Sequence, residues 1–122
     1  MVRKVFYVEK YWKVIVYYNV DYDFTSVIIK DFKKADIELK LQKEAIETMI
    51  KEEAKAVTVS NIKKHLSIVL LNKHNSYTDY LNSIVHEAEH IKQDMLMAYN
   101  IRDVGEDPAY TIGFLVSKMY RV

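Results

Sequence analysis

The chain contains no cysteine, and this absence excludes two kinds of architecture. Without thiols there is neither a disulfide framework nor a cysteine-ligated zinc site, so histidine and carboxylate side chains are the ligands available to a zinc ion. Glycine and proline are also scarce, with two and one among 122 residues. No stretch has the composition of a linker, and we therefore expect residues 1–122 to form a single domain.

A surplus of charge is missing too, since 18 Lys and Arg residues are matched by 17 Asp and Glu residues. No global field attracts nucleic acid or an anionic membrane, so we expect neither as a partner. Long apolar runs are absent as well: no segment reaches the length that spans a bilayer, and no run of signal-peptide length precedes Glu9. The expectation that follows is a cytoplasmic protein.

What the first half of the chain does contain is apolar periodicity. Residues 2–20 are dense in β-branched and aromatic side chains, which predicts two strands separated near Glu9 and Lys10. Asp23 and Asp36 then have the chemistry of helix N-caps and are expected to open two scaffold helices.

The second half contains one short apolar run and two helical patterns. LSIVLL at 66–71 predicts a further strand. Ser76 fits a capping box and is expected to open a helix that ends near Tyr99. Pro108 is tolerated only in a first helical turn, so the last helix is expected to begin close to Glu106 or Asp107. The prediction is an α+β domain with a small sheet of about three strands.

The helix expected before Tyr99 carries the five-residue motif His86-Glu87-Ala88-Glu89-His90. Residues four apart lie one above the other on a helix, so the imidazoles of His86 and His90 can reach one cation. Glu87 would then lie where a metal-bound water sits and could accept its proton. Zinc would contribute Lewis acidity and lower the pKa of that water.

Helical angles separate the two histidines from the expected core. At about 100° per residue, His86 and His90 point nearly opposite to the apolar side of the helix. The alternative interpretation is a solvated polar face on which two histidines occur by accident. His65 and His74 lie outside any ligand spacing and are interpreted as surface residues. The apolar side comprises Leu81, Ile84, Val85, Ala88, Ile91 and Met95.

A zinc site with three protein ligands needs one more donor, and four carboxylates follow the motif. Asp94 lies a turn beyond His90 on the same helix, too far along the axis to close a tetrahedron. Glu106 follows a turn containing Gly105, which can fold the chain back over the histidines. The alternative role for Glu106 is a carboxylate favoured at a helix N-terminus by the macrodipole. The other candidates are Asp103 and Asp107, of which Asp107 is the nearest competitor.

With HEAEH at 86–90 and GEDPAYTIGFL at 105–115, the sequence resembles the zincin superfamily. Within it, the arrangement is similar to that of gluzincins, in which two helical histidines are joined by a glutamate from a following helix. More narrowly, the chain looks like short metallopeptidase-like proteins of phages and gut bacteria. Four features are shared with these proteins. The first two are a Trp-Lys-Val stretch (12–14) and a strand similar to SIVLLN. The other two are the segment NSIVHE followed by a second histidine, and a Gly-Glu pair followed by Ala-Tyr and Ile-Gly. The match is most specific from about residue 66 to 116.

The resemblance implies roles for individual residues. His86, His90 and Glu106 become zinc ligands and Glu87 the general base, in an enzyme that hydrolyses peptide bonds of a peptide or protein substrate. Tyr110, one turn after Glu106, is a candidate to hydrogen-bond a developing oxyanion; its alternative is an ordinary amphipathic tyrosine. Two rival functions are a catalytically silent zincin-like interaction module of a mobile element and an adaptor with a fortuitous motif.

Overall fold

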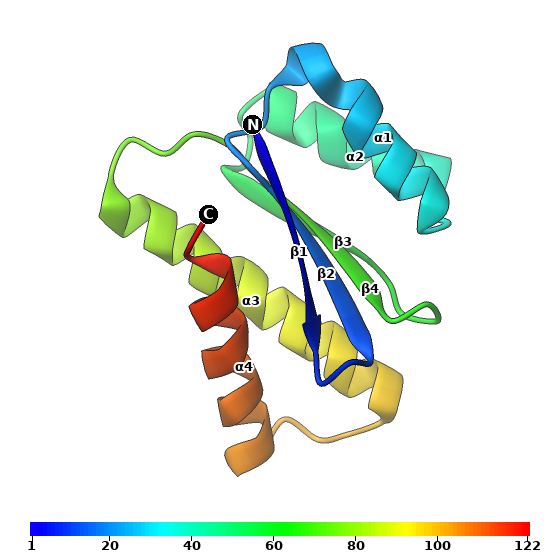
Figure 1. Cartoon of the computed structure of the whole chain (residues 1–122), viewed down its shortest axis with the longest axis vertical. Helices are drawn as coiled ribbons and strands as arrows, with labels where there is room; N and C mark the ends of the chain where they lie inside the picture. Colours follow the sequence, from blue (N-terminus) through cyan, green and yellow to red (C-terminus); the bar gives the residue numbers. More distant parts are fainter.

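In the computed structural model, which covers all 122 residues, helices enclose a four-stranded sheet on both faces (Figure 1). Helices α1 and α2 cover one face, and α3 and α4 cover the other. The elements are β1 (Val2–Val8), β2 (Trp12–Tyr18), η1 (Tyr22–Phe24), α1 (Thr25–Lys34), α2 (Leu39–Ile50), β3 (Ala56–Asn61), β4 (Leu66–Leu71), α3 (Tyr77–Tyr99) and α4 (Glu106–Met119).

The sheet is mixed, with strand order β1-β2-β4-β3. β1 and β2 form an antiparallel hairpin, β2 and β4 pair in parallel, and β3 and β4 are antiparallel. The parallel pair is made possible by the two helices between β2 and β3, because parallel neighbours need a long crossover connection. β1 and β3 are therefore the two edges of the sheet.

Alternation along the central strands produces two separate cores. Trp12, Val14, Val16 and Tyr18 of β2 face α3 and α4, whereas Ile15 and Tyr17 face α1 and α2. On the α3 and α4 side the core is completed by Phe6, Val8, Val69, Leu71, Ile84, Ala88, Ile91, Met95, Leu115 and Met119. On the other side it is completed by Ile28, Phe32, Ala35, Ile37, Ala45, Met49, Val59, Ile68 and Leu70.

The predicted α+β class is confirmed, but the sheet has four strands rather than about three. The strand missed by the sequence prediction is β3, whose side chains are mostly half-buried. An edge strand in contact with polar neighbours lacks the continuous apolar run that identified β4, although Val57 and Val59 alternate with Thr58 and Ser60.

Two of the predicted helix caps were wrong. Asp36 has φ 53° and ends α1: its N–H donates to Lys33 O at 3.1 Å, and the following N–H, of Ile37, donates to Phe32 O at 3.0 Å. This left-handed termination satisfies the last carbonyls of a helix, and Asp tolerates it better than most residues. Asp21 rather than Asp23 caps η1, with its carboxylate accepting from the Asp23 N–H at 3.0 Å.

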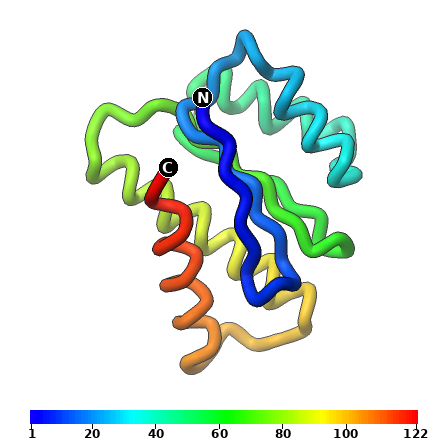
Figure 2. Tube along the Cα trace, in the orientation of Figure 1, coloured from blue at the N-terminus to red at the C-terminus, as the bar shows by residue number.

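The two chain ends lie on the same side of the molecule (Figure 2). Lys4 Nζ in β1 donates to the carbonyl of Arg121 at 2.9 Å, and Tyr18 Oη in β2 donates to that of Met119 at 2.6 Å. These bonds attach the end of α4 to the sheet. No helix combines the length and apolar character needed to cross a bilayer.

Candidate metal centre

The motif lies in the middle of α3, and the packing of this helix determines which side chains reach solvent. Ser76 opens α3 by accepting the N–H of Asp79 at 3.1 Å, as the capping pattern predicts. Ile84, Ala88 and Ile91 are fully buried against the sheet. His86 and His90 lie on the other side and are exposed, so the prediction that they are not core histidines is confirmed.

The two histidine side chains converge. Nε2 of His90 lies 3.1 Å from Nε2 of His86, and the ring centroids are 4.7 Å apart with planes at 81°. Two imidazole nitrogens bound to one tetrahedral zinc lie about 3.3 Å apart, because each Zn–N bond is close to 2.05 Å. In the structure these two nitrogens form a hydrogen bond, and their separation is also close to that of two ligands of a single ion.

Glu87 differs from its two neighbours because it is 3% exposed. Thr58 Oγ1, on the edge strand β3, donates to Glu87 Oε1 at 3.0 Å. Burial raises the pKa of Glu87 above its usual value, while the Thr58 hydrogen bond and the charges of His86 and His90 oppose that rise. A carboxyl group whose pKa lies above its ordinary value, beside two imidazoles, has the properties of a general base.

Thr58 is the residue of this site that the sequence analysis missed. It could not be placed without β3, since only the pairing of β3 with β4 sets Thr58 opposite Val69 on the face covered by α3. The alternation in AVTVSN was the available signal, because it puts Thr58 and Ser60 on one face of a strand.

No third histidine or carboxylate joins His86 and His90 in a group that could hold a metal ion. Glu106 is exposed on the first turn of α4. The chain that leads to it runs along another side of α3, where Lys92 Nζ contacts Asp103 at 3.0 Å. Lys92 is two residues beyond His90, which is about 200° around the helix axis. The structure thus brings together His86, Glu87 and His90, and leaves Glu106 apart from them.

Asp94, which the sequence analysis ranked behind Glu106, lies on the flank of α3 that faces β3. It lines a groove of about 410 Å³ together with Thr58 and other residues of β3 and α2. Glu87 reaches Thr58 from the same flank. Asp94 and Glu87 therefore face the same sheet edge, whereas Glu106 does not.

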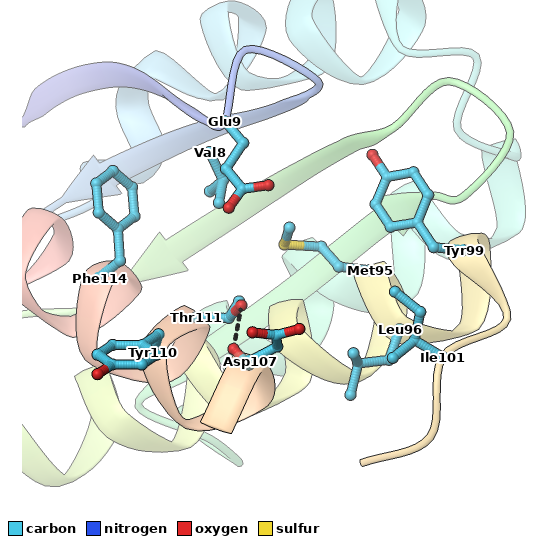
Figure 3. A pocket seen from close by; sticks show the side chains of 10 residues that line it. All are labelled: Val8, Glu9, Met95, Leu96, Tyr99, Ile101, Asp107, Tyr110, Thr111 and Phe114. Carbon is cyan, nitrogen blue, oxygen red and sulfur yellow. Dashed lines mark hydrogen bonds between the residues drawn. The ribbon is translucent and has the colours of Figure 1, made fainter. Parts of the chain in front are cut away.

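Tyr110 and Asp107 line a different cleft, formed by α4, the end of α3 and the β1–β2 turn (Figure 3). Tyr110 is 73% exposed, and no hydrogen bond connects it to the motif of α3. The geometry does not bring this tyrosine to the two histidines.

The remaining two histidines are half-buried rather than simple surface residues. His65 stacks on Trp12 with ring centroids 5.4 Å apart, and Tyr99 meets it edge-on at 5.1 Å. His74 Nε2 lies 2.8 Å from Ser83 Oγ. Each has a local packing partner and neither contributes to the His86–His90 pair.

Comparison with known proteins gives no match: none was found among protein-family models, curated proteins or solved structures.

Proposed function

We propose that the His86–His90 segment of α3 binds a zinc ion and that the chain is a zinc-dependent metallopeptidase. The observation that carries this proposal is the 3.1 Å separation of the two histidine Nε2 atoms beside a buried Glu87. Both donors are nitrogens that zinc prefers, and their spacing fits adjacent positions of a tetrahedron. When bound, zinc would polarise a substrate carbonyl and lower the pKa of a coordinated water.

Glu87 accepts the proton of the attacking water in this proposal. Its pKa, raised by burial, lies closer to neutrality than that of an exposed glutamate, which makes it a more effective base at physiological pH. The Thr58 hydroxyl occupies one carboxylate oxygen, Oε1, and thereby fixes the orientation of the group. The other oxygen has no protein hydrogen-bond partner and is free to receive the proton.

A peptide substrate is supported by the free edge of β3. β3 is an outer strand, and the groove along it is bounded by α2 and α3. An extended peptide can pair with such an edge as an additional strand, with main-chain hydrogen bonds supplying affinity. Thr58 lies in the edge strand and contacts Glu87, so a peptide bound there would run beside the proposed base.

The gluzincin pattern assigns the third zinc ligand to Glu106. For Glu106 to reach the histidines, residues 100–105 and the first turn of α4 must rearrange, because the Lys92–Asp103 ion pair holds this segment on another side of α3. Asp94 would require no rearrangement of this segment, because it lies on α3 itself, on the flank that faces β3. The assignments of Glu106 and of Asp94 as the third ligand therefore predict different effects of mutation on zinc binding.

The test of the proposed reaction is Glu87→Gln, assayed with zinc-loaded protein and fluorescein-labelled casein. The amide keeps the shape of the side chain but cannot accept a proton, so turnover should fall by at least about 100-fold while zinc content stays unchanged. Glu89→Gln is the matched control, since Glu89 is half-exposed and pairs with Lys92 rather than with Thr58. Equal turnover in Glu87→Gln and wild type would remove Glu87 from the mechanism.

The second candidate function is a zincin-like interaction module that holds zinc without hydrolysis. It is favoured by the separation of Glu106 and Tyr110, the remaining residues of the peptidase assignment, from His86, Glu87 and His90. Stoichiometric zinc in a wild-type protein that leaves casein intact, and leaves an unbiased peptide library intact as well, would favour this module over the peptidase.

A further inference from the structure

The cleft that Tyr110 and Asp107 line lies away from the histidine pair. It has a volume of about 590 Å³ and lies between the C-terminal part of α3, the N-terminal half of α4 and the end of β1 (Figure 3). Its wall is mainly apolar, with Val8, Met95, Leu96, Ile101 and Phe114 among the lining residues. Met95, Leu96 and Tyr99 place it on a side of α3 different from that of His86 and His90.

Charge in this cleft has a single sign. Glu9, in the β1–β2 turn, and Asp107, in the first turn of α4, are the charged lining residues, and no Lys, Arg or His joins them. Neither carboxylate takes part in an ion pair. Figure 3 shows both side chains turned toward the cleft, one from the β1–β2 turn and the other from α4.

Three aromatic rings add to this pattern. Tyr99, Tyr110 and Phe114 are 39%, 73% and 38% exposed, although aromatic side chains of this size are normally more deeply covered. The faces of such rings attract cations, and the attraction strengthens when a ligand displaces water. An apolar wall, exposed rings and two unpaired carboxylates are together complementary to a cation with an apolar body.

We propose that this cleft binds a small organic cation, an ammonium or guanidinium group carried on an aromatic or alkyl body. The cationic head would lie between Glu9 and Asp107, and the body would pack on Met95, Phe114 and the tyrosine rings. The volume falls within the range of small-molecule sites, about 300–1,000 Å³, which favours a compact ligand over a protein segment. This inference is independent of the proposed zinc chemistry, because it uses none of the residues of the α3 motif.

The test uses three probes of similar shape and different charge: 2-phenylethylammonium, neutral 2-phenylethanol and anionic 3-phenylpropanoate. Each is titrated into the ¹⁵N-labelled full chain, and amide chemical shifts are followed. We expect the cation to bind several-fold more tightly than the alcohol, the anion to bind most weakly, and the shifts to centre on residues 95–101 and 107–114. Equal affinity for cation and alcohol, or shifts confined to other regions, would overturn the proposal.

Two variants separate charge from packing. Asp107→Asn should weaken binding of the cation about threefold, as expected for loss of one partly exposed charge, and leave the alcohol unchanged. In the double variant with Glu9→Gln, the affinity for the cation should fall to the affinity for the alcohol. Asp23→Asn, an exposed carboxylate outside the cleft, is the matched control and should have no effect. Unaltered cation binding in the double variant, or tighter binding of acetyl-Phe-Lys-amide than of 2-phenylethylammonium, would refute a small-cation site.

Discussion

At the scale of single residues, the contrast between Glu87 and its neighbours is the most informative feature. A carboxylate that is 3% exposed has lost hydration, and a single hydrogen bond from Thr58 only partly replaces it. A glutamine or an apolar residue would fit the same position at lower cost. Carboxyl groups whose pKa is perturbed by burial and by neighbouring charged groups cluster at functional sites.

The Arg3–Asp31–Tyr17 cluster shows the structural use of a buried acid. Arg3 donates to Asp31 through Nε at 2.8 Å and through Nη2 at 3.0 Å, and Tyr17 Oη donates to the same carboxylate. Burial by itself raises the pKa of Asp31, but these hydrogen bonds and the charge of Arg3 outweigh it and leave the pKa below 3.8. The charged form of Asp31 is therefore stabilised by folding.

We predict that Asp31→Asn lowers the free energy of unfolding at pH 7 by about 1–2 kcal/mol, the lower part of the range for charged hydrogen bonds, because Arg3 is partly exposed. A carboxyl with a depressed folded-state pKa stabilises the fold above its unfolded pKa and loses this effect as pH falls through the folded value. The difference between variant and wild type should accordingly shrink below about pH 4. Urea unfolding at several pH values measures it.

The control for this prediction is Asp36→Asn, which removes a carboxylate paired with Lys64 where both side chains are largely exposed. Its effect should stay within about 0.5 kcal/mol. Two results would show that the cluster does not contribute through the charge of Asp31. One is an effect of Asp31→Asn at pH 7 as small as that of Asp36→Asn, and the other is an effect of Asp31→Asn at pH 3 as large as its effect at pH 7.

At the scale of elements, α3 was the best predicted part of the chain. Its cap at Ser76 and its end near Tyr99 follow from local chemistry. Most of its predicted apolar face is covered, but Val85 is 48% exposed. β3 and the start of α2 could not be predicted in the same way. β3 depends on pairing with β4, and α2 begins after Glu38 without a side-chain cap.

The cap of α3 gives a prediction at this scale. Ser76→Ala removes the acceptor of the Asp79 N–H and should lower the free energy of unfolding by about 1 kcal/mol. Thr78→Ala, at an exposed position of the same first turn, is the control and should be neutral or slightly stabilising, since alanine favours helix. Thermal unfolding monitored by circular dichroism compares the two variants, and equal melting temperatures would contradict the assignment of Ser76 as the cap.

The third ligand of the proposed zinc site depends on the arrangement of elements, because α4 carries Glu106 and α3 carries Asp94. The gluzincin pattern predicts that Glu106→Ala weakens zinc binding by more than about tenfold and that Asp94→Ala and Asp107→Ala change it little. Competition with a chromogenic zinc chelator measures all three variants. The opposite outcome, in which Asp94→Ala alone weakens zinc binding, would assign the third ligand to Asp94, on the flank of α3 that faces β3.

At the scale of the whole molecule, the layered fold separates the two proposed sites. α3 packs near β3 and β4, and α4 packs near β1. The histidine pair and the cleft lined by Tyr99, Tyr110 and Phe114 lie on different sides of α3. The sequence predicted the histidine pair because four-residue spacing is a local property of a helix. It could not predict that Glu106 and Tyr110 lie apart from that pair, since the path from Tyr99 to Gly105 depends on long-range contacts such as Lys92 with Asp103.

Whether α3 holds a metal ion is decided by the zinc content of untagged protein purified without chelator. Elemental analysis should give close to one zinc per wild-type chain and almost none for His86→Ala or His90→Ala, because each variant leaves an incomplete set of ligands. His74→Ala, which removes a histidine hydrogen-bonded to Ser83, should retain the metal. A wild-type protein without zinc, or variants of His86 and His90 with undiminished zinc, would contradict the assignment of a metal site to α3.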